Sequence, residues 1–435
     1  MGRFRPSCEG ADDEATSALG ACAERAVSEH AASAKWTTRL GVAVLPILAA
    51  LTGIRGVSAQ TGLETPSDLC IQAIQTAIVN RTRDLFQDIY LPNQHQRPHV
   101  LYQLAEHPNS GDTFIDRGEE ILLARLGLEP ASECTATKEP GSMMKKCDNE
   151  ETQRLLRGSA TVMFHGGGNW GDVWPQHHQR RLRAMERFSL QPDMNIITMP
   201  NSLKFYDEDG RQKDEKIVAS IVAAKHPTTR ITFLFRQQDS FETAKAMYPG
   251  VDVRLVPDLA FLLGPLIRVD FDKFKYDILF LARRDKEGGD DLTKSAQEIH
   301  EGMAKLAPDL KYFVGDWKDN PTSETLFYKH RVVEQNLPSM RHGVVVDASV
   351  RFFSTAKVII CDRLHASVLA LLMGIPHVIV DGGPDSAAYG KRLRTRAVAF
   401  EVSDHCTQSS LRYREATSLS EGISEGLALL DEFFG

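Results

Sequence analysis

Short apolar runs alternate with longer segments of helical periodicity through the first half of the chain. The apolar runs are rich in β-branched residues, which is typical of buried strands. They are His99–Leu104, Ala160–Phe164, Asn195–Met199, Arg230–Phe235 and Val253–Val256. The intervening segments predict helices over Thr113–Leu126, His178–Arg187, Asp214–Ala224 and Ser240–Tyr248. Because helices separate the strands, the pattern predicts a parallel sheet covered by helices on both faces.

The same alternation restarts after Gly264-Pro265. The strand candidates there are Tyr276–Leu281, Lys311–Val314, Gly343–Val346, Lys357–Cys361 and His377–Val380. We therefore expect an α/β protein with an N-terminal Rossmann-like domain over residues 96–265 and a C-terminal one over residues 266–435. Residues 59–95 are interpreted as a stem and a leading helix around Leu69–Leu85. Asp239 with Glu242 resembles a capping box.

The N-terminal region carries an uncharged, almost wholly apolar run over residues 40–54, with basic residues on both sides. We interpret residues 40–58 as a signal-anchor, with residues 1–39 as a cytosolic tail and the catalytic part in the lumen. So short a span suits the membranes of the early secretory pathway and predicts a Golgi location. Cleavage near Val57-Ser58-Ala59, which gives a secreted or lumenal protein, and a buried core helix are the alternatives.

Two further features fit a lumenal catalytic part. Asn80-Arg81-Thr82 is a glycosylation acceptor sequence. Cys134 and Cys147 flank a polar insertion and are placed to close it with a disulfide. By contrast, we expect Cys361 to be a small buried hydrophobe.

Composition restricts the possible partners. The chain of 435 residues is 42% hydrophobic and 25% charged, as in ordinary globular proteins. Its formal net charge of −7 argues against nucleic-acid binding, so local arginines must meet any anionic substrate. The adjacent His177 and His178 lack the spacing of a helical metal pair, and we place them at a helix start or surface. We therefore expect no catalytic metal.

The run Lys357–Gly374 carries the most specific chemistry. A short strand leads to Asp362, a good N-cap residue, and the apolar positions that follow predict a buried helix ending at Gly374. Arg363 and His365 then lie in the first helical turn, where free N–H groups and the helix dipole favour an anion. An arginine beside a histidine at such a place can hold a phosphate or carboxylate and move a proton.

A second run, Thr161–Trp174, joins an apolar strand to His165, three glycines, Asn169 and Asp172. Glycines at a strand end let the backbone approach a ligand closely, although a tight structural turn is the alternative. Four basic or titratable residues each lie just past an apolar strand, and they are His165, Arg236, Arg283 and Arg363. Because ligands of parallel α/β sheets bind at the carboxyl ends of strands, these residues are candidates for one site.

These motifs together resemble the polysaccharide pyruvyltransferase family. The agreements follow one order along residues 96 to 400, and they are Asn109–Asp112, His165–Arg180, Phe235–Ser240, Leu281–Glu287, Asp362–His365 and Tyr389–Lys391. Six ordered motifs make coincidence improbable. The chain departs from the family where relatives commonly carry histidine in P-Q-S-x-H, because it has Lys204 there.

The resemblance implies two Rossmann-like domains arranged as in B-type glycosyltransferases, and phosphoenolpyruvate as the donor, with no cofactor. It implies donor contacts by Arg236, Arg283, Arg363, Leu364, His365 and Lys391, the last to the phosphate. His365 would be the acid/base, with Asp172 or His165 activating an acceptor hydroxyl. Lys204, Asn169 and Asp172 would contact the sugar acceptor, a glycan.

Each of these roles has an alternative in which the residue only supports the structure. Arg236 could form an ion pair with Asp239, Lys391 could belong to a solvated basic face, and His365 could be a buried histidine satisfied by a neighbour. His165 and Asp172 could stabilise turns. For the whole protein, a nucleotide-sugar-dependent glycosyltransferase of the same two-domain plan is the alternative function, and a degenerate glycan-binding protein is a third.

Overall fold

The computed structural model describes residues 66–87, 97–104, 109–135, 145–269, 274–282, 292–316, 338–380 and 412–435. All of them belong to one compact unit, Glu64–Gly435. The predicted tail and signal-anchor, residues 1–58, lie outside the described residues. Among the helices that are described, none has the length and apolar composition needed to cross a membrane.

The first sheet has eight parallel strands in the order β3-β2-β1-β4-β6-β7-β8, with β5 pairing beside β6. These strands are β1 (His99–Tyr102), β2 (Ser132–Thr135), β3 (Lys145–Lys146), β4 (Thr161–Phe164), β5 (Gly167–Gly171), β6 (Asn195–Lys204), β7 (Arg230–Phe235) and β8 (Asp252–Leu255). Apart from β5, this is the Rossmann order, and the strand order reverses between β1 and β4. A ligand-binding crevice is expected beyond the carboxyl ends of those two strands.

The second sheet has five parallel strands in the order β10-β9-β11-β12-β13. These are β9 (Tyr276–Leu281), β10 (Tyr312–Gly315), β11 (Ala356–Cys361), β12 (His377–Val380) and β13 (Tyr413–Ala416). This is the other common doubly wound order, and its reversal lies between β9 and β11. The predicted α/β class with two Rossmann-like sheets is confirmed.

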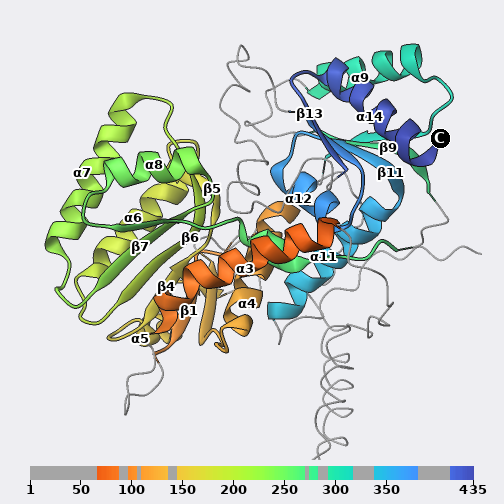
Figure 1. Ribbon diagram of the computed structural model, residues 1–435. Helices are drawn as coiled ribbons and strands as arrows, with labels where there is room; N and C mark the ends of the chain where they lie inside the picture. The colour runs from red at the N-terminus through yellow and green to blue at the C-terminus, as the bar shows by residue number, and fades with distance from the viewer. Residues whose placement is uncertain are drawn as a thin grey trace, which may run out of the picture. The chain divides into compact units, whose positions relative to one another are not determined.

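Helices cover both faces of each sheet (Figure 1). On the first sheet, α6 (Pro175–Ser189), α7 (Glu208–Ala224) and α8 (Gln238–Met247) pack on one face, and α3 (Pro66–Gln87) and α4 (Ser110–Arg125) pack on the other. On the second sheet, α9 (Leu292–Leu306) and α14 (Leu419–Phe434) cover one face, while α11 (Pro338–Ser354) and α12 (Leu364–Leu372) cover the other. A short α5 (Glu150–Leu155) precedes β4.

One apolar core joins the two halves. It includes Ile74 of α3, Phe114 of α4, Leu279 of β9 and Leu369 of α12, all fully buried. The 3-10 helix η1 (Leu259–Leu263) lies within this core and contacts α3, α4 and α12. The loop ends of both sheets are therefore held in fixed relation by buried side chains.

The predicted strand over Gly343–Val346 is wrong, because these residues belong to α11. Three consecutive valines favour a strand locally. However, Val346, Val350 and Phe353 are buried at helical spacing, and the Ser349 hydroxyl donates to the Val345 carbonyl. Packing against the core therefore outweighs the β propensity of the run.

The predicted capping box is also wrong. The N-cap of α8 is Gln237, whose side chain makes no capping hydrogen bond. Asp239 lies inside the first turn, and its carboxylate accepts from the Ser240 backbone N–H at 2.7 Å. The other predicted helices of the first half are confirmed within three residues at each end, except that α7 begins six residues earlier than predicted, at Glu208.

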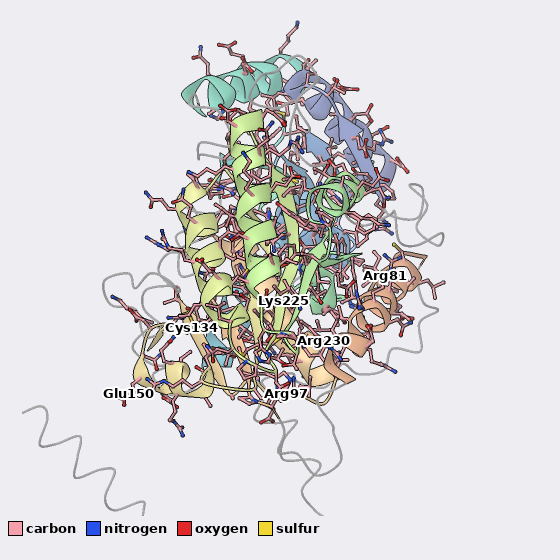
Figure 2. The ribbon with its side chains drawn as sticks, turned by 90° about the vertical axis from the view of Figure 1, so that its left-hand side faces the viewer. Arg81, Arg97, Cys134, Glu150, Lys225 and Arg230 are labelled. Carbon is pink, nitrogen blue, oxygen red and sulfur yellow. A yellow bond between two sulfur atoms is a disulfide. The ribbon has the colours of Figure 1, made fainter. Side chains whose placement is uncertain are left out.

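The predicted disulfide between Cys134 and Cys147 is present and ties β2 to the turn after β3. Cys134 is labelled in Figure 2. Cys361 is a free, buried thiol, as predicted, and burial raises its pKa above the ordinary value. Asn80 is exposed on α3, whereas Thr82 of the same acceptor sequence is buried and donates to the Ile78 carbonyl at 2.8 Å.

Helix α4 approaches η1 so closely that Gly118 has no room for a side chain. A Cβ placed there would lie 2.2 Å from the backbone oxygen of Leu259. We expect Gly118→Ala to lower the free energy of unfolding by about 1–3 kcal/mol, because backbone must move to admit the methyl group. Urea denaturation measures this.

Gly302→Ala on α9 is the matched control. A Cβ there would meet only Cδ1 of Ile423, the end of a flexible side chain, at 2.7 Å. The higher helix propensity of alanine should then leave stability unchanged or raise it by up to about 1 kcal/mol. Equal losses in the two variants would contradict the backbone clash at Gly118.

Candidate active site

The reversal points of both sheets carry the loops with the predicted chemistry. At the first, β1 leads toward Asn109 and the start of α4, and β4 leads into His165 and the glycine run. At the second, β11 leads into Arg363 and α12. The two sets of loops meet, because a Cβ placed on Gly111 would lie 2.5 Å from Nδ1 of His365. Asn109 shapes this contact by capping α4 through its side chain, which accepts from the Gly111 N–H at 3.2 Å.

The centre of the site is the carboxylate of Asp258, which no sequence motif had indicated. Its Oδ2 accepts a hydrogen bond from Nη1 of Arg236 at 2.5 Å and lies 3.2 Å from Nε2 of His365. Its Oδ1 accepts from the Ala260 N–H at 2.9 Å and so caps η1. One buried carboxylate therefore joins residues that follow β7, β8 and β11.

The electrostatics of this group favour an ionised Asp258. Burial alone would raise its pKa, but the charges of His365 and Arg236 outweigh burial and hold the pKa of Asp258 well below the usual range. The side chain of His365 is 11% exposed, whereas that of Asp258 is 1% exposed. His365 is thus the member of the pair that a substrate can reach.

Arg236 is fixed on several sides. Its Nε donates to Oγ of Ser202 at 2.7 Å, and its backbone N–H donates to the Asn201 carbonyl at 3.0 Å. The glycine run passes beside it, since a Cβ on Gly168 would lie 3.6 Å from Nη2 of Arg236. The alternative in which Arg236 pairs with Asp239 is wrong, because its partner is Asp258.

Arg363 is the N-cap of α12, so the prediction that Asp362 caps this helix is off by one residue. Its Nε and Nη2 donate to the two carboxylate oxygens of Asp316 at 2.5 and 2.6 Å. Arg363 and Asp316 are both buried. Asp316 directly follows β10, so a strand-end carboxylate again holds a strand-end arginine.

Leu364, the first residue of α12, is half-buried and packs against the core joining the two sheets. Arg283 and Lys391 lie outside the described residues, and their donor contacts stay predictions.

His165 lies in a different environment, beneath the glycine run. Its Nδ1 lies 2.8 Å from Oδ1 of Asp116 and 3.3 Å from Oε1 of Glu119, both on α4. Oε1 of Glu119 also accepts from the Gly166 N–H at 3.0 Å. His165 is only 2% exposed. This position matches the alternative in which His165 stabilises the turn.

Burial alone would lower the pKa of His165, but the charges of Asp116 and Glu119 raise it well above the ordinary value. Burial in turn raises the pKa of Glu119. Within the described part of the chain, these three residues are the one group spaced to hold a metal ion. The imidazolium already supplies positive charge, and Arg181 adds more by donating to the His165 carbonyl at 2.9 Å. The set therefore fits an ion pair.

The predicted acceptor residues form a second group around β5 and β6. Both carboxylate oxygens of Asp172 accept from the Tyr206 N–H at 2.8 Å, and Nζ of Lys204 lies 4.9 Å from the centre of the Tyr206 ring. Oδ1 of Asn169 accepts from Nη2 of Arg181 at 2.7 Å. Asp172 and Lys204 thus both contact Tyr206, and the Asp172 contact is that of a turn-stabilising side chain.

The histidine pair at the start of α6 separates into two environments. His177 is exposed, whereas His178 is buried and pairs with Asp214. Asp214 also accepts from the hydroxyl of Tyr248, which in turn accepts from Nε1 of Trp170 at 3.0 Å. The placement of both histidines at a helix start is confirmed.

Sequence reasoning missed Asp258, Asp316 and Ser202, and it gave no role to Gly111 within the motif Asn109–Asp112. Asp316 follows an apolar strand directly, and Asp258 follows β8 after two residues. Their position just past a strand was the available signal. The strand-end rule points first to side chains that can bind an anion, and aspartate is not one of these.

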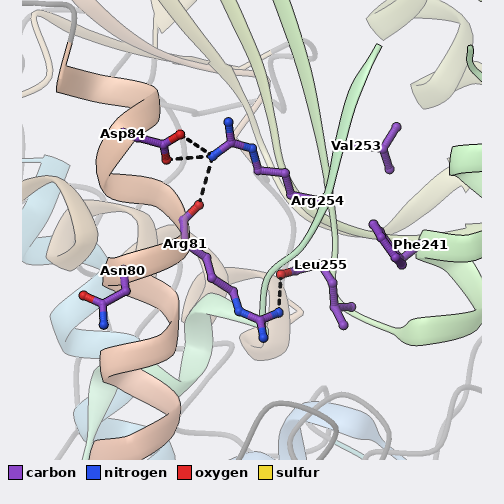
Figure 3. Close-up of a pocket in the computed structure, with 7 residues that line it drawn as sticks. All are labelled: Asn80, Arg81, Asp84, Phe241, Val253, Arg254 and Leu255. Carbon is purple, nitrogen blue, oxygen red and sulfur yellow. Dashed lines mark hydrogen bonds and ion pairs between the residues drawn. The ribbon is translucent and has the colours of Figure 1, made fainter. Parts of the chain in front are cut away.

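A surface pocket of about 580 Å³ lies between α3 and β8 (Figure 3). Its charged residues bond to their neighbours, with Arg254 on Asp84 and Arg81 on the Leu255 carbonyl. It includes none of the residues around Asp258, so we assign no chemistry to it.

Two Rossmann-like sheets with arginines and a histidine at their strand ends define a doubly wound α/β protein. Residues 84–384 match the polysaccharide pyruvyl transferase family, and the chain belongs to that family. The predicted family is therefore confirmed.

Among relatives, the chain is 31% identical to pyruvyl transferase 1 of Schizosaccharomyces pombe over 293 residues, which cover 65% of each chain. It thus spans somewhat less than two thirds of that relative. It is 24% identical to the putative pyruvyl transferase EpsO of Bacillus subtilis over 69% of this chain and 84% of EpsO. A protein of Klebsiella pneumoniae of known structure is 17% identical, with a TM-score of 0.44 over 78% of this chain and 99% of its own.

The raised pKa of His165 predicts a pH-dependent contribution to stability. A raised folded-state pKa means that the contribution is complete below the unfolded value of about 6.5 and declines as the pH rises through the folded value. We expect the difference in unfolding free energy between the native protein and His165→Gln to be larger at pH 6 than at pH 9. Denaturant titrations at both pH values measure it. A difference that grows with pH would contradict the buried imidazolium.

Proposed function

We propose that this protein transfers pyruvate from phosphoenolpyruvate to two hydroxyls of one sugar in a glycan, forming a cyclic ketal. The observation that carries the proposal is the Arg236–Asp258–His365 group beside Arg363 at the start of α12. Family membership and the names of the two pyruvyl transferase relatives support the same reaction.

The donor carries a carboxylate and a phosphate, which guanidinium groups bind well. Arg236 and Arg363 are the proposed contacts, together with the first-turn N–H groups of α12, to which no side-chain cap is bonded. Because Arg236 and Arg363 each have a buried carboxylate partner, directed hydrogen bonds, and not net charge, would meet the donor.

His365 is the proposed acid and base. One sugar hydroxyl gives its proton to His365 and adds to the central carbon of the donor, and His365 passes that proton to the methylene carbon. A second hydroxyl then displaces phosphate and gives its proton to His365, which releases it with the departing phosphate as the ketal closes. An imidazole that takes a proton and then gives it up suits both steps near neutral pH. Lys204, Asn169 and Asp172 are the proposed acceptor contacts.

The apolar run over residues 40–54 and the acceptor sequence at Asn80 support a location in the secretory pathway, which we likewise propose.

The donor is tested by incubating the full-length protein with phosphoenolpyruvate and, separately, with nucleotide sugars. We expect phosphoenolpyruvate alone to raise the melting temperature, because a ligand that binds only the folded state stabilises it. With a suitable glycan, phosphate should be released and the glycan should gain the mass of a pyruvate ketal. Stabilisation by nucleotide sugars alone would support the glycosyltransferase alternative. Binding without any phosphate release across a panel of glycans would support a binding protein.

Variants of Arg363 and His365 separate donor binding from proton transfer. Alanine at Arg363 would leave Asp316 buried without its cation, which destabilises proteins strongly. Arg363→Lys keeps a positive charge beside Asp316 but has no planar guanidinium group to donate two parallel hydrogen bonds. We therefore expect the binding free energy of the donor to weaken by roughly 1.5–3 kcal/mol. His365→Gln should bind the donor and turn over about 10²–10⁴-fold more slowly.

Calorimetry with phosphoenolpyruvate and initial rates, run on the same preparations, distinguish the two variants. Near-normal turnover in His365→Gln would refute the acid/base role, and unchanged donor affinity in Arg363→Lys would refute the donor contact.

A further inference from the structure

Asp258 has three partners and uses both of its oxygens. Oδ1 is committed to the Ala260 N–H at the start of η1, at 2.9 Å. Oδ2 is shared between Nη1 of Arg236 and Nε2 of His365, at 2.5 and 3.2 Å. An ionised carboxylate can only accept hydrogen bonds, so the His365 nitrogen that faces it must carry a proton.

We propose that Asp258 is a positioning residue that keeps the proton of neutral His365 on Nε2 and balances the charge of Arg236 until an anionic donor arrives. The identity of that donor rests on the proposed function above. Nδ1 is then the ring nitrogen that exchanges protons. It lies so close to Gly111 that a Cβ there would come within 2.5 Å, so a side chain at this position would press on the nitrogen.

The same carboxylate opposes donor binding. It occupies one N–H group of Arg236 and places a negative charge beside the position of an incoming anion. Asp258 should therefore favour turnover through His365 and weaken the affinity for the donor. A residue with a purely structural role would not shift these two quantities in opposite directions.

Asp258→Asn tests this because the surroundings fix the orientation of the amide. The buried Ala260 N–H needs an acceptor, so Oδ1 of the asparagine keeps that place and its NH₂ group takes the place of Oδ2. The NH₂ group then donates to Nε2 of His365, which forces the ring proton onto Nδ1. It also faces Nη1 of Arg236 donor to donor, which releases that group toward a ligand.

Three measurements are made on full-length protein with labelled histidine, and the His365→Gln variant identifies the His365 signals. In native protein, ¹⁵N spectra should show neutral His365 with its proton on Nε2, and in Asp258→Asn on Nδ1. The kcat of Asp258→Asn should fall about 10²–10⁴-fold, as expected when a catalytic histidine is held in the wrong tautomer. Its Kd for phosphoenolpyruvate should fall about tenfold or more.

Asp316→Asn is the matched control, because it removes the carboxylate beside Arg363 and leaves His365 untouched. It should leave the His365 tautomer unchanged. A proton on Nδ1 in native protein would overturn the proposal even if Asp258→Asn fails to fold. An unchanged tautomer in Asp258→Asn, or weaker donor binding with normal turnover, would also overturn it. If native protein binds no phosphoenolpyruvate, the proposed function fails, while the tautomer measurement still decides the role of Asp258.

Discussion

The close approach of α4 to η1 is the constraint on which the site depends. Gly118 lets the backbone of α4 contact the Leu259 carbonyl, and Leu259 directly follows Asp258. The N-terminus of the same helix places Gly111 against His365. In its middle turns, Asp116 pairs with His165 and Glu119 accepts from the Gly166 N–H, which fixes the glycine run. One buried helix thus sets the positions of Asp258, His365 and the glycine run together. Displacing this helix would disturb all three, although α4 supplies none of the proposed acid/base or donor-binding side chains.

The second organising feature is the pairing of buried charges. Arg236 is paired with Asp258, Arg363 with Asp316, and His165 with Asp116 and Glu119. Removing one member of such a pair leaves an uncompensated charge in the interior, which costs more than the pair contributes. The pairs are therefore better understood as devices that fix geometry than as sources of stability.

Much of this arrangement could be predicted from the sequence. Apolar strands are recognisable from their composition, so the bounds of the strands Tyr276–Leu281 and His377–Val380 could be predicted to the residue. Strand ends then indicated Arg236 and Arg363, because parallel strands bring their carboxyl ends to one edge, and the predicted helix start indicated His365. The valines of α11 were misassigned because burial on a helical face, which local propensity does not report, decides their structure. Asp258 was missed because its role depends on Arg236 and His365, which are distant from it in sequence and reach it only in the fold.

The helices differ in whether a side chain caps their N-terminus. Side-chain caps are present on α4, α5, α7 and α14, from Asn109, Asn149, Asp207 and Ser418. None is present on α6, which begins with Pro175, or on α8 and α12, which begin next to Arg236 and Arg363. A missing cap leaves first-turn N–H groups without an internal acceptor, at a cost of about 1 kcal/mol. Polar caps elsewhere show that the sequence readily provides them. At α12, the uncapped first turn beside Arg363 therefore leaves N–H groups for the anionic donor proposed above, and binding of that donor would recover the cost of the missing cap.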